Sequence, residues 1–317
     1  MPSIRRSLVT FVIAVGAWAG QKPAPAPAKA APAPVEKPTL VGSETCQACH
    51  EDIYTAFQKS RHQSVETDKK RGWAGNGCES CHGPASKHIE TASADDIRNP
   101  LKLTAGAADK GCLTCHLNQP THSGRLQGGH ARSQVACTSC HSVHKPEPEA
   151  LRAKKTATIN TQCASCHQGV WAQFARPHSH QLKQGAMSCT DCHNPHGNQL
   201  AKQVRTFASN EPGCLGCHTN TRGPFTFEHA PMRQTGCATC HEVHGSANPR
   251  MLTRHEVRFV CLECHANVGS LTSTAPVNSG AGVVPPSFHD LRSTRFQNCT
   301  LCHQKIHGSH ADRNYLR

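Results

Sequence analysis

The chain has 317 residues, of which 20 are cysteine and 24 are histidine, and aromatic residues make up only 4% of it. Large apolar side chains are too scarce to dominate an ordinary hydrophobic core, so the composition argues against one or two conventional domains. The formal net charge of +13 first suggests a nucleic acid or an anionic membrane as partner.

Residues 1–19 have the pattern of a signal peptide. Arg5 and Arg6 precede a short apolar stretch over 8–16, and small residues mark a cleavage point after Ala19. A membrane anchor is the alternative, but the stretch is shorter than the about 20 residues that a spanning helix needs. No cysteine follows the cut, so a lipoprotein anchor is not supported. We therefore expect an exported protein.

Residues 20–40 are rich in Pro and Ala and contain few large apolar side chains. A segment of this composition cannot bury a core, and it favours an extended, semi-rigid tether. The ordered region is expected to start at Val41.

All 20 cysteines fall into ten copies of the pattern Cys-x-x-Cys-His. This pattern is typical of c-type haem attachment, in which each sulfur bonds a vinyl group and the adjoining imidazole binds the iron. The predicted thioether cysteines are Cys46, Cys49, Cys78, Cys81, Cys112, Cys115, Cys137, Cys140, Cys163, Cys166, Cys189, Cys192, Cys214, Cys217, Cys237, Cys240, Cys261, Cys264, Cys299 and Cys302. The predicted proximal ligands are His50, His82, His116, His141, His167, His193, His218, His241, His265 and His303.

Zinc ribbons and disulfide bonds are the competing interpretations of so many cysteines. Neither explains why a histidine follows every cysteine pair. The sequence therefore predicts ten covalently bound haems c.

Fourteen histidines lie outside the motifs, whereas three methionines after the signal peptide cannot serve ten irons. We therefore expect two histidines on each iron. Consecutive motifs can be grouped in pairs, because every second motif has one additional histidine before it and one shortly after it. This grouping gives five two-haem units with two additional histidines each. The predicted distal ligands are His62, His88, His130, His144, His180, His196, His229, His244, His289 and His307.

Four histidines remain: His122, His178, His255 and His310. They are expected to face solvent or haem propionates, because the ligand count closes without them. The choice between His178 and His180 stays open, since the two are only two residues apart.

The predicted fold is a multihaem cytochrome c of irregular loops and short α-helices, with little or no sheet, wrapped round closely packed haems. Burial of the flat apolar cofactors supplies the driving force that the side chains lack, so the chain without haem should be largely unfolded. Two short helices are expected after the motifs at 46–50 and 163–167, where Ile53/Phe57 and Val170/Phe174 are spaced i,i+4. Haem propionates account for the basic charge, and no motif supports nucleic-acid binding.

Every motif ends in His and the other histidines suffice to close every iron, so the sequence favours electron transfer over catalysis. No cysteine is left as a nucleophile. A multihaem reductase, which needs an open iron, is one alternative, and a soluble periplasmic shuttle or storage cytochrome is another.

Over about residues 41–310 the sequence resembles the DmsE/MtrA-type periplasmic decahaem c cytochromes. The resemblance depends on several specific sequence segments in addition to the number of haem motifs. They are CESCHGPASKH (78–88), CTSCHSVH (137–144), CTDCHNPHG (189–197), RGPFTFEHAPM (222–232), CATCHEVHG (237–245) and KIHGS (305–309). The departure from the family pattern is His178-Ser179-His180, where family members tend to have adjacent histidines.

This resemblance implies two pentahaem halves, residues 41–178 and 179–317, that form an elongated chain of bis-histidine haems. It also implies a periplasmic protein associated with the outer membrane, within or against a β-barrel porin. Its partners would be a periplasmic or inner-membrane cytochrome donor and an outer-surface cytochrome acceptor. The expected role is extracellular electron transfer in anaerobic respiration.

Overall fold

The computed structural model describes residues 36–122, 124–144, 155–198, 200–206, 213–265, 277–279, 282–284 and 289–316. The chain divides into two units, Met1–Lys37 and Pro38–Arg317. All ten Cys-x-x-Cys-His motifs lie in described segments of the second unit. The predicted signal peptide and the part of the tether up to residue 35 lie outside the described residues.

The described helices are short, and the longest, α5 (Ala105–His116), has twelve residues. The others are α1 (Ser43–Gln47), α2 (Glu51–Gln58), α3 (Gly77–His82), α4 (Ser86–Thr91), α6 (Gly129–Arg132), α8 (Lys155–Ala164), α9 (Gln168–Gln173), α10 (Cys189–Cys192), α11 (Ala230–Gln234) and α12 (Val257–Leu262). Short 3₁₀ helices cover Arg61–Thr67, Pro100–Lys102, Pro120–His122, Cys137–Ser139, Ala201–Gln203, Gly213–Gly216, Thr219–Thr221, Cys237–Thr239, Pro249–Met251, Thr294–Phe296 and Cys299–Leu301.

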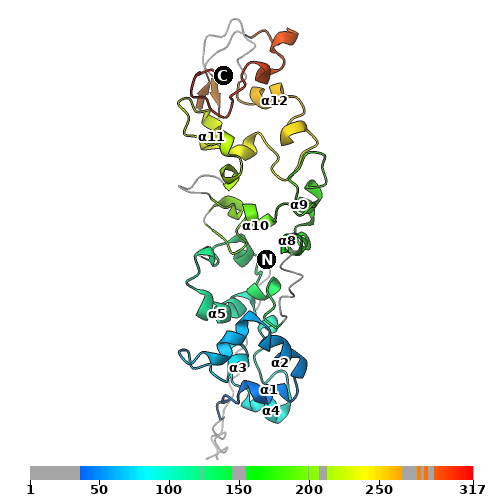
Figure 1. The fold of residues 1–317 in the computed structure, drawn as a ribbon, viewed down its shortest axis with the longest axis vertical. Coiled ribbons are helices and arrows are strands. Elements are labelled where there is room, and N and C mark those ends of the chain that lie inside the picture. The colour runs from blue at the N-terminus through cyan, green and yellow to red at the C-terminus, as the bar shows by residue number, and fades with distance from the viewer. Residues whose placement is uncertain are drawn as a thin grey trace, which may run out of the picture. The chain divides into compact units, whose positions relative to one another are not determined.

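Sheet structure in the described segments is limited to two strands of three residues each. Strands β1 (Val277–Ser279) and β2 (Gly282–Val284) pair antiparallel, with Val277 opposite Val284. Figure 1 shows the short helices of the second unit joined by long irregular segments, with α1–α4 gathered at one end and α11 and α12 toward the other. The prediction of short helices and loops with little or no sheet is therefore confirmed.

Few apolar side chains are buried by protein alone. Among the described residues these are Phe57, Ala85, Ala108, Phe174, Leu182 and Leu215. In contrast, Leu101 is 76% exposed and Leu301 is 67% exposed. The two expected helices form as α2 and α9; Phe57 is buried within α2, and Phe174 is buried at the C-cap of α9. An interior this small leaves much apolar surface for a bound group to cover.

Backbone contacts also join segments that are far apart in the sequence. His178 and Ser246 exchange two backbone hydrogen bonds, of 3.1 and 2.8 Å, and Phe227 and Ser309 exchange two, of 2.8 and 2.9 Å. Each pair links one two-haem unit to the next. In the described part of the chain, no helix has the length and apolar character required to cross a bilayer.

Candidate haem-binding sites

Each Cys-x-x-Cys-His motif folds as one helical turn. In site after site the histidine N–H bonds the carbonyl of the first cysteine, as in His50 to Cys46 at 2.9 Å and His303 to Cys299 at 2.9 Å. Residues one turn apart lie on the same face of a helix. The two sulfurs and the imidazole of a motif are therefore presented together, as covalent haem attachment requires.

Every motif histidine faces a second histidine across a gap of nearly constant width. We number the sites 1 to 10 in motif order. Their ring centroids lie 5.8 to 6.4 Å apart in the pairs His50–His88, His82–His144, His116–His62, His141–His196, His167–His130, His193–His244, His218–His180, His241–His307, His265–His229 and His303–His289. The second member of each pair is one of the ten predicted distal histidines.

The width of this gap fits one metal ion bound by both rings. A metal–imidazole bond is about 2 Å long, and a ring nitrogen lies about 1.1 Å from the ring centre, so two rings on one iron have centres about 6.2 Å apart. The paired histidines therefore match the size of a bis-histidine haem iron site.

Backbone carbonyls orient many of these imidazoles. The Nδ1 atoms of His82 and His241 lie 2.9 and 2.8 Å from the carbonyl oxygens of Arg98 and Arg250. A carbonyl can only accept, so Nδ1 must hold the proton and donate it. The Nε2 atom then keeps its lone pair for a metal.

Burial keeps several of the paired histidines in the neutral form that a metal needs. It lowers the pKa of His229, His265 and His307, and it lowers the pKa of His196 to about 4, where nearby histidines add to the effect. Burial disfavours the charged imidazolium because it removes solvating water. These rings are therefore ready to bind iron at neutral pH.

The pairing crosses the boundaries of the two-haem units, which the sequence did not reveal. Only His50–His88 and His303–His289 join histidines of one unit. In the other eight pairs, an even-numbered site receives its second histidine from the next unit, and an odd-numbered site receives it from the preceding unit. His141–His196 and His167–His130 illustrate the exchange between the second and third units. Each of two neighbouring units thus supplies the second histidine at one site of the other.

Within each unit, the first cysteines of the two motifs are close neighbours. A thiol hydrogen bond joins Cys46 to Cys78, lowering the pKa of Cys78 to about 6 and raising that of Cys46. The equivalent thiol contacts are Cys112–Cys137, Cys163–Cys189, Cys214–Cys237 and Cys261–Cys299. Sites 1 and 2, 3 and 4, 5 and 6, 7 and 8, and 9 and 10 are therefore adjacent.

Between units, cysteines of an even-numbered motif lie near those of the following motif. The charge of the Cys81 thiolate contributes to the raised pKa of Cys112. The corresponding electrostatic contacts are Cys140–Cys163, Cys192–Cys214 and Cys240–Cys264. At all nine steps between consecutive motifs, cysteines are therefore near enough to interact electrostatically, and neighbouring attachment sites follow the order of the sequence.

A buried polar side chain joins the two motifs in each of the first three units. It lies three residues before the first cysteine of the odd-numbered motif and accepts a hydrogen bond from the first cysteine N–H of the next motif. The bonds are Cys78 to Ser43 Oγ at 3.2 Å, Cys137 to Asp109 Oδ1 at 2.7 Å, and Cys189 to Asn160 Oδ1 at 2.9 Å. Sequence reasoning missed these residues because their side chains differ in type.

Asp109 is expected to be the most sensitive of the three. It is 5% exposed and forms an ion pair with Arg125, which is 6% exposed. Asp109→Asn keeps an acceptor for Cys137 but leaves the arginine charge buried and unpaired, which costs about 3–5 kcal/mol. Thermal unfolding of the haem-loaded protein measures the loss. Asp68→Asn, which breaks the exposed pair with Arg71, should leave the melting temperature unchanged, and equal losses would contradict the prediction.

The four histidines left over from the ligand count have different surroundings. His178 pairs through its backbone with Ser246, whereas the His180 ring faces His218 and hydrogen-bonds the Val243 carbonyl at 2.9 Å. His122 packs edge-on against His196, with ring centroids 4.2 Å apart, and its ring centroid lies 6.3 Å from that of His116, so that His116 has both His62 and His122 at the distance of the ligand pairs. His255 and His310 are exposed. The geometry therefore favours His180 over His178 as a ligand.

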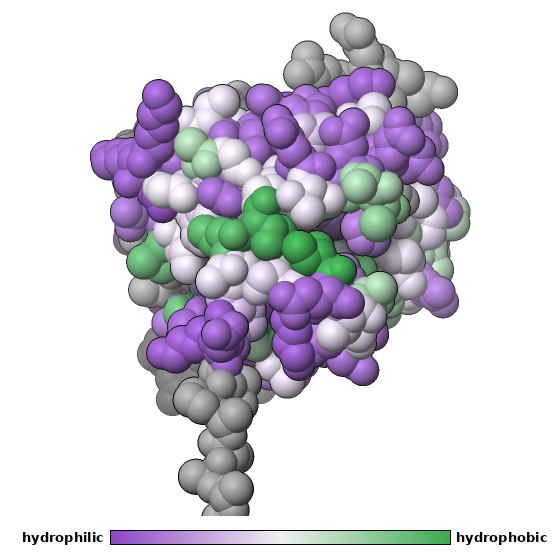
Figure 2. Space-filling view, turned by 90° about the horizontal axis from the view of Figure 1, so that it is seen from below, coloured by the Kyte–Doolittle hydropathy of each residue, from purple (hydrophilic) through white to green (hydrophobic). Residues whose placement is uncertain are grey.

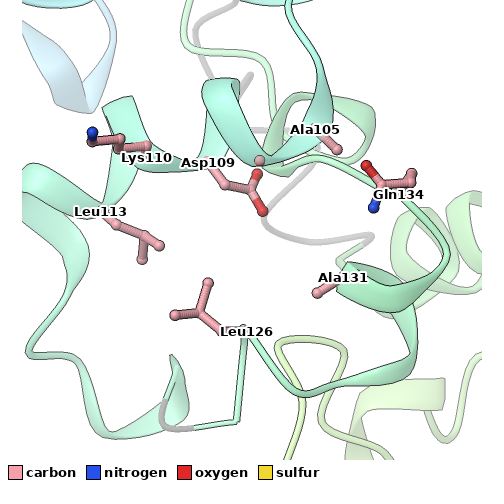
Figure 3. A pocket seen from close by; sticks show the side chains of 8 residues that line it. Ala105, Asp109, Lys110, Leu113, Leu126, Ala131 and Gln134 are labelled. Carbon is pink, nitrogen blue, oxygen red and sulfur yellow. The ribbon is translucent and has the colours of Figure 1, made fainter.

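Apolar surface is left uncovered beside these sites. Figure 2 views the molecule from the end where α1–α4 lie and shows apolar residues gathered in a furrow between polar ones. A pocket of about 340 Å³ lies between α5 and the segment that includes α6, with Leu113, Leu126 and Ala131 in its lining (Figure 3). Leu113 belongs to the motif of site 3, so this apolar lining adjoins a haem attachment site.

All twenty cysteines lie in described segments and have free thiols, which leaves them available for haem. The model of the doubled CXXCH motif family matches residues 180–223 and 229–270. The chain is 31% identical to the multiheme cytochrome MtrA of Shewanella baltica (strain OS185) over 273 residues, covering 84% of this chain and 78% of the relative. It is 28% identical to the cytochrome c-type protein NrfB of Escherichia coli O6:H1 over 141 residues, covering 39% of this chain and 72% of the relative. The chain is a member of the MtrA family of multihaem c-type cytochromes, which transfer electrons.

Proposed function

We propose that the chain binds ten haems c, each held by one motif and by the two histidines that face each other at that site, and that it conducts electrons along them. The observation that supports this most strongly is the set of ten facing histidine pairs, in each of which the ring centroids lie 5.8 to 6.4 Å apart. When bound, each haem iron supplies reversible one-electron exchange.

The role of the protein is to hold the sites in sequence and to keep their axial positions filled. Two imidazoles at every site leave no position for a substrate, which supports electron transfer and not catalysis as the function. Histidine pairs that cross between units hold neighbouring sites in register. His141–His196 is the one pair that joins residues 41–178 to residues 179–317, which supports two pentahaem halves.

The proposed setting is the periplasm, where the cytochrome joins a β-barrel porin in the outer membrane. Similarity to MtrA over most of both chains supports this. The barrel is needed on physical grounds as well, because an irregular polar chain cannot cross lipid unless another protein surrounds it. A periplasmic or inner-membrane cytochrome would donate electrons, and an outer-surface cytochrome would accept them in anaerobic respiration. Association with a barrel protein in detergent-solubilised outer membranes is the first test, and a monomer recovered only in the periplasmic fraction would contradict it.

A conduit and a soluble shuttle respond differently when one central haem is removed. Cys163→Ser together with Cys166→Ser deletes site 5. In vesicles containing the cytochrome–barrel complex and a sealed-in redox dye, we expect dye reduction by external dithionite to stop, because the remaining sites are split into two groups. A shuttle would lose only one-tenth of its electron capacity.

The haem count of the variant, measured by mass, must be nine for this comparison to hold. Cys299→Ser with Cys302→Ser, which removes terminal site 10, is the matched control: it also leaves nine haems but does not divide the chain. If the site 5 variant conducts as well as the wild type, the linear conduit is wrong.

A further inference from the structure

Three short segments recur at the junctions between units, each with a distal histidine followed by glycine. They are residues 195–197, 243–245 and 306–308, with His196, His244 and His307 in the middle. We call them the junction segments. Each of these histidines faces the motif histidine of the preceding unit, at sites 4, 6 and 8 respectively.

The residue before each of these histidines bonds to another distal histidine. His130 donates from Nδ1 to the Pro195 carbonyl at 2.9 Å, and His180 donates to the Val243 carbonyl at 2.9 Å. His229 forms the equivalent bond with the backbone of Ile306. These three donors face the motif histidines of sites 5, 7 and 9.

The glycine after each histidine lets the junction segment approach the preceding unit closely. At Gly245, φ is +150°, and an added Cβ would overlap the Gln173 carbonyl oxygen and lie 2.9 Å from the Ser179 Cβ. A Cβ at Gly308 would overlap the Phe225 ring, and one at Gly197 would overlap Gly124. A side chain is thus excluded at all three positions.

Backbone pairing fixes the register of two of the segments in the same way. Ser246 pairs with His178, and Ser309 pairs with Phe227. In both cases a residue two positions after the segment's histidine pairs with a residue two positions before the donor histidine. His178 therefore occupies the place of Phe227, and His180 that of His229. This equivalence explains why His178 faces no motif histidine.

From this repeated geometry we infer that each junction segment positions the distal ligands of two consecutive haems, one that it bears and one whose imidazole it anchors through a carbonyl. Sites 4 and 5, 6 and 7, and 8 and 9 are thereby aligned in pairs. Gly197, Gly245 and Gly308 are positioning residues, because the carbonyl and the histidine reach their places only while the glycine allows the close approach. This inference rests on the ligand pairs of the proposed function.

Gly245→Ala tests the inference because it displaces one segment without removing a ligand. We expect the variant to keep ten haems by mass and to convert two of the ten irons from low-spin to high-spin, as quantified by electron paramagnetic resonance of the ferric protein. Gly169→Ala is the matched control in the preceding unit, which Gly245 approaches, since no atom lies within 4 Å of its added Cβ, and it should leave all ten irons low-spin.

His244→Ala separates failure of this inference from failure of the proposed function. It should open only the iron of site 6, because the backbone carbonyl that anchors His180 remains. No open iron in His244→Ala would overturn the ligand pairing itself. If His244→Ala opens one iron but the number of high-spin irons in Gly245→Ala is not two, the junction inference alone is overturned. If Gly245→Ala is not recovered with ten haems, Gly308→Ala gives the same test at sites 8 and 9.

Discussion

Without its haems, the chain is expected to lose the short helices that it has in the structure. Helices of twelve residues or fewer are marginal in water unless tertiary packing supports them. The six buried apolar residues of the described segments are too few to provide that packing, so burial of the haems must supply it.

Far-ultraviolet circular dichroism and limited proteolysis measure this effect. Protein expressed without the haem-attachment machinery should give the spectrum of an unfolded chain and be digested rapidly, whereas the haem-loaded protein should resist digestion. If the haem-free chain kept its helical signal and its resistance, the haems would not form the interior.

Replacing one distal histidine is expected to open one iron and leave the rest unchanged. In His229→Ala the site loses the ring that lies 6.3 Å from His265 and 18° from parallel with it. Thioether attachment depends on the cysteines, so ten haems should remain. One of the ten ferric irons should become high-spin. With one imidazole left, and with the other axial position open or holding a weakly bound water, its ligand field is weaker.

His255→Ala is the matched control, since His255 is exposed and is not among the facing ring pairs. Mass spectrometry gives the haem count, and absorption and paramagnetic resonance spectra give the spin states. If His229→Ala stayed fully low-spin and no substitute ligand were found, the assignment of His229 would be wrong.

The sequence predicts the attachment sites well because their chemistry is local. His50 lies four positions after Cys46, and one helical turn brings them together wherever the motif occurs. The same holds for α2 and α9, whose apolar spacing is visible in the sequence. The number of distal histidines also follows from counting.

Partner assignment could not be predicted from the sequence, because it depends on how separate units approach one another. His196 lies close to the motif of site 6 in the sequence, yet its ring faces His141 of the preceding unit. The choice of His180 over His178 likewise depends on the backbone pairing of His178 with Ser246. The one visible signal was the repeated His-Gly after the motifs of sites 6, 8 and 10.

The most direct test of the central claim is a quantitative spin count on the haem-loaded ferric protein, referenced to its intact mass. We predict a mass increase equal to ten haems and a resonance spectrum in which all ten irons are low-spin with two axial nitrogen ligands. A markedly smaller mass increase, or high-spin irons in the unmodified protein, would contradict it.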